Sequence, residues 1–136
     1  MKALDYLKAL GVALEVIIIT MAASYLMVAF YAYFIEPGQP QEFYNAAALW
    51  IAPWSSYILG PLVFFAFNYR LARRSPARNA LGFAAATIGM YIVVDFSMVP
   101  AMGLPLSSLV TFSVAFWLLV KLAAALAGAR MGYAKA

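Results

Sequence analysis

Two residue types are missing from this chain, and their absence removes most of the chemistry expected of an enzyme. The sequence contains no cysteine, which excludes disulfides, thiolate metal sites and cysteine nucleophiles. It contains no histidine either, so the commonest general base and the commonest zinc and haem ligand are missing. No glycine-rich phosphate-binding loop is present. We therefore expect no enzymatic activity, no metal and no cofactor.

Charge is also scarce. Only 10% of the residues are charged and 67% are hydrophobic, whereas a soluble domain has about 25% charged residues. This composition predicts an integral membrane protein, with the lipid bilayer as its first partner. The formal net charge is +4, but the basic residues stand beside apolar runs. They are better interpreted as topology signals than as a nucleic-acid surface.

Four apolar stretches are long enough to cross a membrane, since a spanning helix needs about 20 mainly apolar residues. They cover approximately residues 9–35, 45–69, 80–99 and 105–128. The first stretch exceeds the apolar core of a signal peptide, so we expect it to be retained. Proline and glycine punctuate the connections at 36–43 and 100–105, where the chain must reverse. The whole chain, 1–136, is then a single transmembrane domain.

The basic residues predict the orientation. Arg70, Arg73, Arg74 and Arg78 occur at the connection between the second and third spans, and the remaining lysines and arginines outside the spans are near the two ends of the chain. By the positive-inside rule, both termini and this arginine-rich connection are cytoplasmic. Topology alone explains the four arginines, which also suit contact with anionic lipid headgroups. Size and topology together favour a bacterial inner membrane.

Short residues at helical spacing predict how the spans associate, because membrane helices pack through small side chains. The first span repeats Gly11, Glu15, Ile18, Ala22 and Tyr25 at alternating steps of four and three. Such a row is expected to face the neighbouring helices. The predicted fold is an all-α, compact antiparallel bundle of four transmembrane helices.

Glu15 and Lys121 are two of the three charged residues well inside the spans. Each lies at roughly 9–11 Å from the cytoplasmic end of its predicted span, at about 1.5 Å per residue. They are therefore candidates for a structural ion pair, since an unpaired charge in the membrane is costly. Alternatively, Lys121 extends to the inner surface and leaves Glu15 unpaired as a binding group.

Asp95 is the third intramembrane charge and lies roughly 22 Å beyond the start of its span, toward the outer side. No lysine or arginine is expected near it, and its candidate neighbours are Tyr91, Trp54 and Ser56. Two interpretations stay open. Asp95 is a ligand for something positive, or it is a shallow polar residue that stays hydrated near the outer rim.

Two classes of function follow. In the first, the protein is an oligomeric transporter or channel for a proton, a cation or a small cationic solute, with identical copies lining the pathway. In the second, it is a non-catalytic accessory or assembly subunit that docks onto partner membrane subunits. A bundle that binds lipid or another hydrophobic ligand is a third hypothesis. Asp95 in the outer third of its span favours transport, because such a charge is costly to keep for packing alone.

Overall fold

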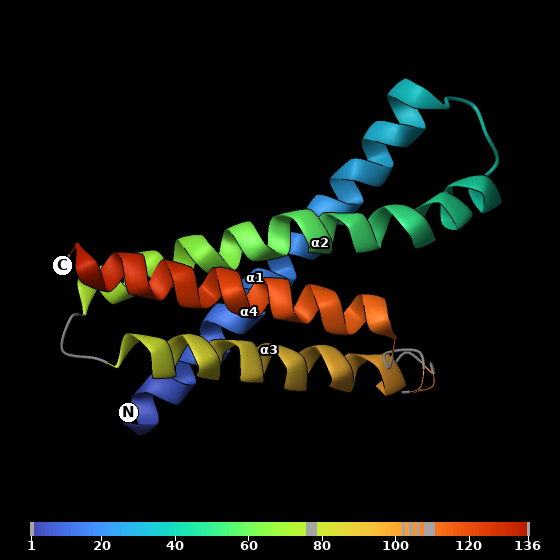
Figure 1. Cartoon of the computed structure of the whole chain (residues 1–136). Coiled ribbons are helices and arrows are strands. Elements are labelled where there is room, and N and C mark those ends of the chain that lie inside the picture. Colours follow the sequence, from blue (N-terminus) through green and yellow to red (C-terminus); the bar gives the residue numbers. More distant parts are fainter. Residues whose placement is uncertain are drawn as a thin grey trace.

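The computed structural model describes residues 2–75, 79–101, 103, 105, 107 and 111–135. Within these residues the chain is helical: α1 (Ala3–Phe30) continues into the short π-helix η1 (Tyr31–Ile35), followed by α2 (Gln41–Arg74), α3 (Ala80–Ala101) and α4 (Phe112–Ala134). All four long helices have the length and apolar character needed to span a membrane. Successive helices run in opposite directions, so the two termini lie at the same end of the bundle (Figure 1).

The helix ends follow from local sequence. α2 begins directly after Pro40, which fixes an extended backbone, and ends with Arg73 and Arg74, whose charges favour a helix C-terminus. At the start of α4 the Thr111 side chain accepts a hydrogen bond from the Val114 amide at 3.3 Å. α2 remains helical through Pro53 and Pro61.

The predicted spans are all present, but three of the helices are longer than expected. α1 begins at Ala3 rather than near residue 9, and α2 extends by several residues at both ends. α4 continues to Ala134, well past the end predicted at 128. The start predicted at residue 105 falls in a stretch of which the structure describes only some residues.

The longest interface joins α2 and α4, and it depends on glycine. A side chain at Gly128 would collide with the backbone carbonyl of Phe65, and one at Gly132 with that of Tyr69. The two backbones therefore approach more closely than any larger residue permits. This is the small-residue packing by which helices associate in the absence of a hydrophobic drive.

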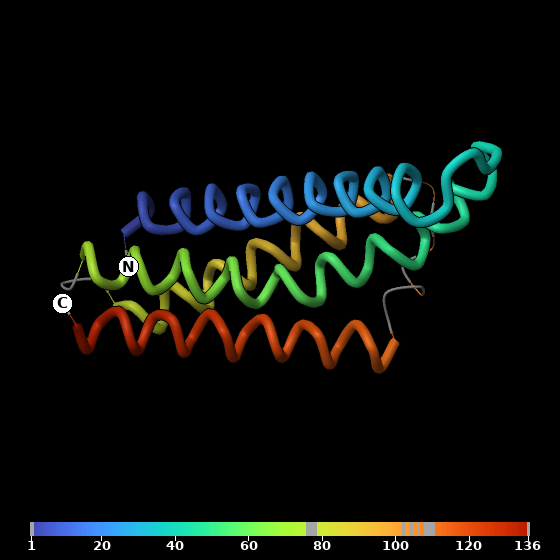
Figure 2. Tube along the Cα trace, turned by 90° about the horizontal axis from the view of Figure 1, so that it is seen from above, coloured from blue at the N-terminus to red at the C-terminus, as the bar shows by residue number. Residues whose placement is uncertain are grey.

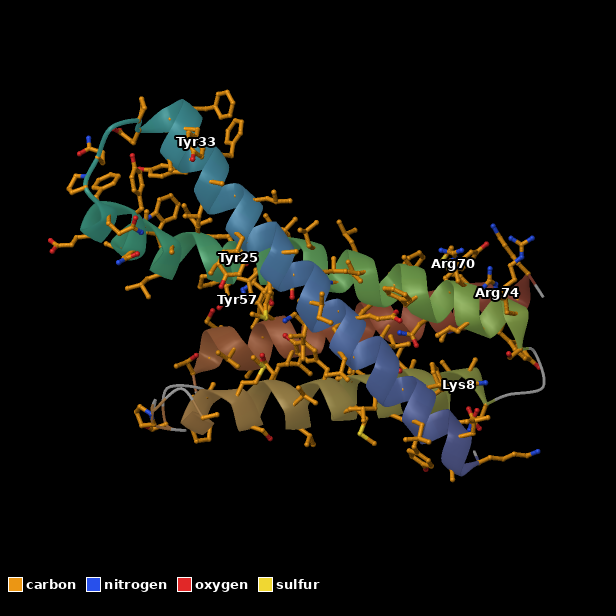
Figure 3. All side chains as sticks on the ribbon, turned by 180° about the vertical axis from the view of Figure 1, so that it is seen from behind. Lys8, Tyr25, Tyr33, Tyr57, Arg70 and Arg74 are labelled. Carbon is orange, nitrogen blue, oxygen red and sulfur yellow. The ribbon has the colours of Figure 1, made fainter. Side chains whose placement is uncertain are left out.

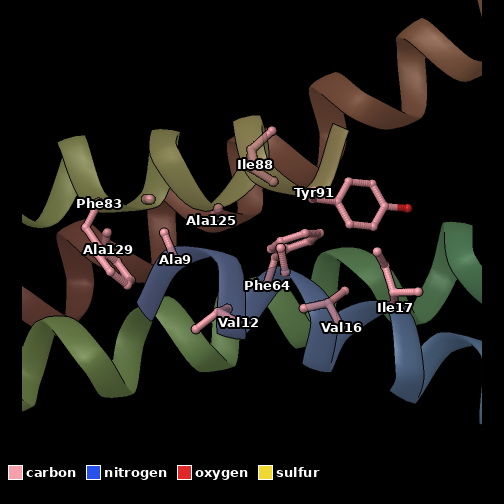
Figure 4. Packing of buried hydrophobic residues seen from close by; sticks show 12 residues of the cluster. Ala9, Val12, Val16, Ile17, Phe64, Phe83, Ile88, Tyr91, Ala125 and Ala129 are labelled. Atoms are coloured by element: carbon pink, nitrogen blue, oxygen red, sulfur yellow. The ribbon is translucent and has the colours of Figure 1, made fainter. Parts of the chain in front are cut away.

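The core gathers side chains from all four helices (Figure 4). Phe64 of α2 is fully buried and meets the Tyr91 ring edge-on, with ring centroids 5.2 Å apart. The α1 residues in this core are on the face that carries Val12, Val16 and Ile17. The row of α1 residues that was predicted to pack, from Gly11 to Tyr25, lies on the opposite side of the helix. Tyr25 within this row is 73% exposed, so the prediction of the packing face is wrong.

The α1–α2 hairpin is longer than the α3–α4 hairpin and projects beyond it (Figure 2). α2 has 34 residues and α4 has 23, which corresponds to about 51 Å and about 35 Å of helix. The tip of the α1–α2 hairpin is closed by Tyr44. Its hydroxyl donates to the Glu36 carbonyl at 2.7 Å and accepts from the Gln39 amide at 3.0 Å. In Figure 3, Lys8, Arg70 and Arg74 are at the end opposite to this tip.

Candidate functional site

A polar centre lies inside the bundle around the side chain of Lys121. This lysine of α4 is only 4% exposed. Its Nζ donates to Ser56 Oγ of α2 at 2.9 Å and to Tyr91 Oη of α3 at 2.8 Å. The same nitrogen lies 4.6 Å from the centroid of the Tyr91 ring. A buried ammonium requires such partners, because its loss of hydration is otherwise uncompensated.

Glycine makes room for this lysine. Gly60 of α2 is buried, and a Cβ added there would lie 2.7 Å from Lys121 Cε. The aliphatic part of the lysine therefore passes directly over the α2 backbone, which explains how a long side chain fits at a close helix–helix interface. A side chain added at Gly60 would therefore require the end of the Lys121 side chain to move.

Hydroxyl groups of α1 and α2 extend the polar centre. Thr20 Oγ1 donates to the Val16 carbonyl at 2.9 Å, and Ser24 Oγ donates to the Thr20 carbonyl at 2.9 Å. The hydroxyls of Ser24 and Ser55 are in hydrogen-bonding contact across the two helices. Back-bonding of this kind satisfies the hydroxyl donors within their own helix and leaves oxygen lone pairs available.

Asp95 faces a cavity of about 260 Å³ beside this centre. The carboxylate is half-buried, and Thr20, Ser24, Ser56 and Tyr91 line the same cavity. In the described part of the chain, the charge that acts on Asp95 is the ammonium of Lys121. The polar groups around the cavity are thus one carboxylate, several neutral hydroxyl oxygens and one neighbouring cation. A proton or a small cation is the species that such oxygens bind.

Three candidates from the sequence meet at this cavity: Asp95, Tyr91 and Ser56. The expectation that Asp95 has no cation within reach is wrong, since the Lys121 ammonium bonds Ser56 and Tyr91, which line the same cavity as Asp95. The cause is the length of α4. Because α4 ends at Ala134, Lys121 lies near the middle of the helix, level with Tyr91 of α3, rather than near the end of the bundle that carries the termini.

Glu15 and Lys121 are not brought together. Glu15 is exposed and lines a different groove with Lys8, Arg70 and Arg74, whereas the Lys121 Nζ is directed at Ser56 and Tyr91. The face of α1 that packs in the bundle excludes Glu15. The predicted ion pair between Glu15 and Lys121 is therefore not formed. The Lys121 ammonium is instead bound by the hydroxyl groups of Ser56 and Tyr91.

The remaining candidates are outside the polar centre. Trp54 is 52% exposed and contacts Tyr57 edge-on, with centroids 6.1 Å apart. Arg70, Arg73 and Arg74 are exposed at the end of α2, and Arg78 falls outside the described residues. Among the residues that the structure describes, no cluster of three His, Cys, Asp or Glu is placed to hold a metal.

Sequence reasoning missed Thr20 and Ser24. Both are small polar residues one turn apart, and they continue the buried face through Val16. A search for hydroxyls at four-residue spacing on the same face would have found them.

Three comparisons with known proteins add nothing to this geometry: no family model, curated protein or solved structure matches the chain.

Proposed function

We propose that this protein crosses a bacterial inner membrane four times and moves a proton or a small cation through the cavity at Asp95. The observation that carries this proposal is the half-buried Asp95 carboxylate, which faces a cavity shared with Thr20, Ser24, Ser56 and Tyr91. A carboxylate at this depth is costly in lipid, so a binding role explains why it is there.

The distribution of charge supports both the orientation and the direction of entry. Except for Lys121, the described lysines and arginines lie at the end that carries the two termini. We assign this end to the cytoplasm. Glu36 and Glu42 are at the opposite end, and acids around an entrance concentrate cations there.

The exchange step follows from the shared neighbourhood of Asp95 and Lys121. When the cavity holds no solute, the Lys121 ammonium stabilises the carboxylate. A proton or cation that enters the cavity takes over this role and is held in addition by hydroxyl oxygens of Ser56 and Tyr91. Lys121 then favours release, because two positive charges compete for one carboxylate. Identical copies of the chain complete the pathway in an oligomer.

Reconstitution into liposomes tests this function. Purified protein is expected to increase the flux of protons, Na⁺, K⁺ or methylammonium above that of empty vesicles. Asp95→Asn is expected to reduce this flux by about tenfold or more, since the carboxylate among the described residues that line the cavity becomes neutral. Glu15→Gln is the matched control, because Glu15 is an exposed acid of α1 that lines a different groove. Equal flux through Asp95→Asn and the parent protein would exclude the proposed site.

A second candidate function is the binding of a hydrophobic ligand. An apolar cavity of about 590 Å³ separates the outer halves of α1 and α2, lined by Met27, Phe30, Trp50 and their neighbours. Titration of an apolar fluorescent probe against Trp50→Phe distinguishes this function, since Trp50 lines that cavity and not the one at Asp95. Native mass spectrometry of gently extracted protein tests the remaining hypothesis, that the chain is an accessory or assembly subunit. In that case unrelated membrane subunits co-purify with it.

A further inference from the structure

A second, separate recess lies beside the core at the edge of the α1–α2 contact, near the end that carries the termini. It has a volume of about 510 Å³ and is formed between α1 and α2. Its polar wall carries Lys8, Arg70 and Arg74, together with the single acid Glu15. We call it the basic groove.

The charges of the basic groove are arranged for an external anion. Arg70 and Arg74 are one helical turn apart, so both side chains emerge on the same face of α2. Lys8 approaches from α1, and Figure 3 shows all three cations at the same end of the molecule. Lys8, Arg70 and Arg74 are all exposed, and among the described residues that line the groove the acid is Glu15. The groove thus has a net charge of about two positive units.

The floor of the groove is apolar and open. Gly11, Val12, Phe67 and Leu71 line it. A Cβ placed on Gly11 would meet no atom within 4 Å, so the space above this glycine is empty of protein. Basic groups at one end and an apolar floor below them match a molecule that combines a phosphate with a hydrocarbon chain.

We propose that the basic groove binds one anionic phospholipid, with its phosphate on Lys8, Arg70 and Arg74 and an acyl chain along Gly11 and Phe67. Arginine side chains pair with phosphate through two parallel hydrogen bonds, which makes this contact specific as well as strong. Glu15 lies about two turns deeper than Lys8 and leaves the outermost cations to the phosphate. This lipid site is independent of the Asp95 cavity.

Native mass spectrometry of the full chain in mixed micelles tests the proposal, with phosphatidylglycerol as the probe and phosphatidylcholine as the neutral reference. The parent protein is expected to retain one phosphatidylglycerol with about tenfold preference over phosphatidylcholine. The double variant Arg70→Gln, Arg74→Gln is expected to lose this preference. Arg73→Gln removes a charge on the same helix turn that does not line the groove, and it is expected to change retention by less than about twofold.

A second pair of variants leaves every charge in place. Gly11→Leu fills the apolar floor and is expected to reduce phosphatidylglycerol retention by about tenfold, since the acyl chain loses its position. Gly89→Leu is the control, because Gly89 on α3 also has open space above it and lies outside the groove. Circular dichroism is the check on folding, and both variants are expected to keep their helical content.

Three outcomes would overturn the proposal. The first is equal retention of both lipids by the parent protein. The second is an equal loss in Arg73→Gln and in the Arg70, Arg74 double variant, which would indicate general surface charge. The third is displacement of the lipid by millimolar inorganic phosphate, which would indicate a site for free phosphate.

Discussion

The buried Lys121 of α4 links three helices, because its ammonium group bonds Ser56 of α2 and Tyr91 of α3. From the sequence, its depth was predicted from the distance to Gly128, where the apolar pattern weakens. The helix continues through Arg130 and Tyr133 to Ala134, so Lys121 is deeper than that estimate. A helix end without a proline is hard to predict, and an error of nearly two helical turns there changes which charges meet. That is why Asp95 was predicted to lack a cation.

A double-mutant cycle tests the revised pairing. Lys121→Met and Asp95→Asn are expected to be coupled by about 1 kcal/mol or more, because one charge acts on the other in a poorly hydrated centre. Glu15→Gln and Lys121→Met are expected to add to within about 0.5 kcal/mol, as residues without shared partners do. The free energy of unfolding of each variant is measured in detergent mixtures. Coupling of Lys121 to Glu15 instead of Asp95 would refute the arrangement.

The Tyr91 hydroxyl makes a contribution to stability that can be measured separately. Tyr91→Phe removes an acceptor from the buried Lys121 ammonium and is expected to destabilise the protein by about 1–3 kcal/mol. Tyr25→Phe is the control, since Tyr25 is 73% exposed. The difference in thermal unfolding between the two variants gives the result. An equal effect of both substitutions would show that Lys121 does not depend on this hydroxyl.

At the level of helices, the sequence predicted the small residues that pack but not always the side on which they do so. Gly60 and Gly128 are small residues that are buried where α2 and α4 meet. In α1 the expected row is largely exposed, and the packed face carries Val12 and Val16 instead. α1 is apolar around most of its circumference, so periodicity carries little information about which of its faces packs against the other helices.

The α2–α4 interface predicts a large effect of a single methyl group. Gly128→Ala places a Cβ against the Phe65 carbonyl, which is backbone and cannot move aside, so a loss of about 1–3 kcal/mol is expected. Gly89→Ala on open α3 is expected to be neutral or stabilising by up to about 1 kcal/mol, since alanine favours helix. The unfolding midpoints of the Gly128→Ala and Gly89→Ala variants are compared. Equal midpoints would contradict the close approach of the α2 and α4 backbones.

The α1–α2 contact can be tested by cross-linking, because the chain has no cysteine of its own. Ser24→Cys with Ser55→Cys is expected to form a disulfide under mild oxidation, since the two hydroxyls are in contact. Ala22→Cys with Ser55→Cys is the control, because Ala22 is on the exposed side of α1. Mobility on a non-reducing gel measures both. Equal cross-linking of the two pairs would mean that α1 is rotated relative to the structure.

For the whole molecule, the number of helices, their approximate positions and their connectivity were predictable, because each depends on long apolar runs separated by proline, glycine or arginine. The projection of the α1–α2 hairpin was not, because it depends on how far helices continue beyond their apolar segments. The cavity at Asp95 needed the structure as well. It requires residues of three helices to share one depth, which no single stretch of sequence determines.

The most direct test of the central claim is whether a cation reaches Asp95. A hydrophobic carbodiimide applied to the protein in liposomes modifies carboxyl groups in apolar surroundings, and peptide mass spectrometry identifies which ones. We predict that Asp95 is modified and that the cation carried in the flux assay slows this reaction over the concentrations at which flux saturates. Glu42, exposed on α2, serves as the reference carboxylate. Modification of Asp95 at a rate indifferent to that cation would contradict the account.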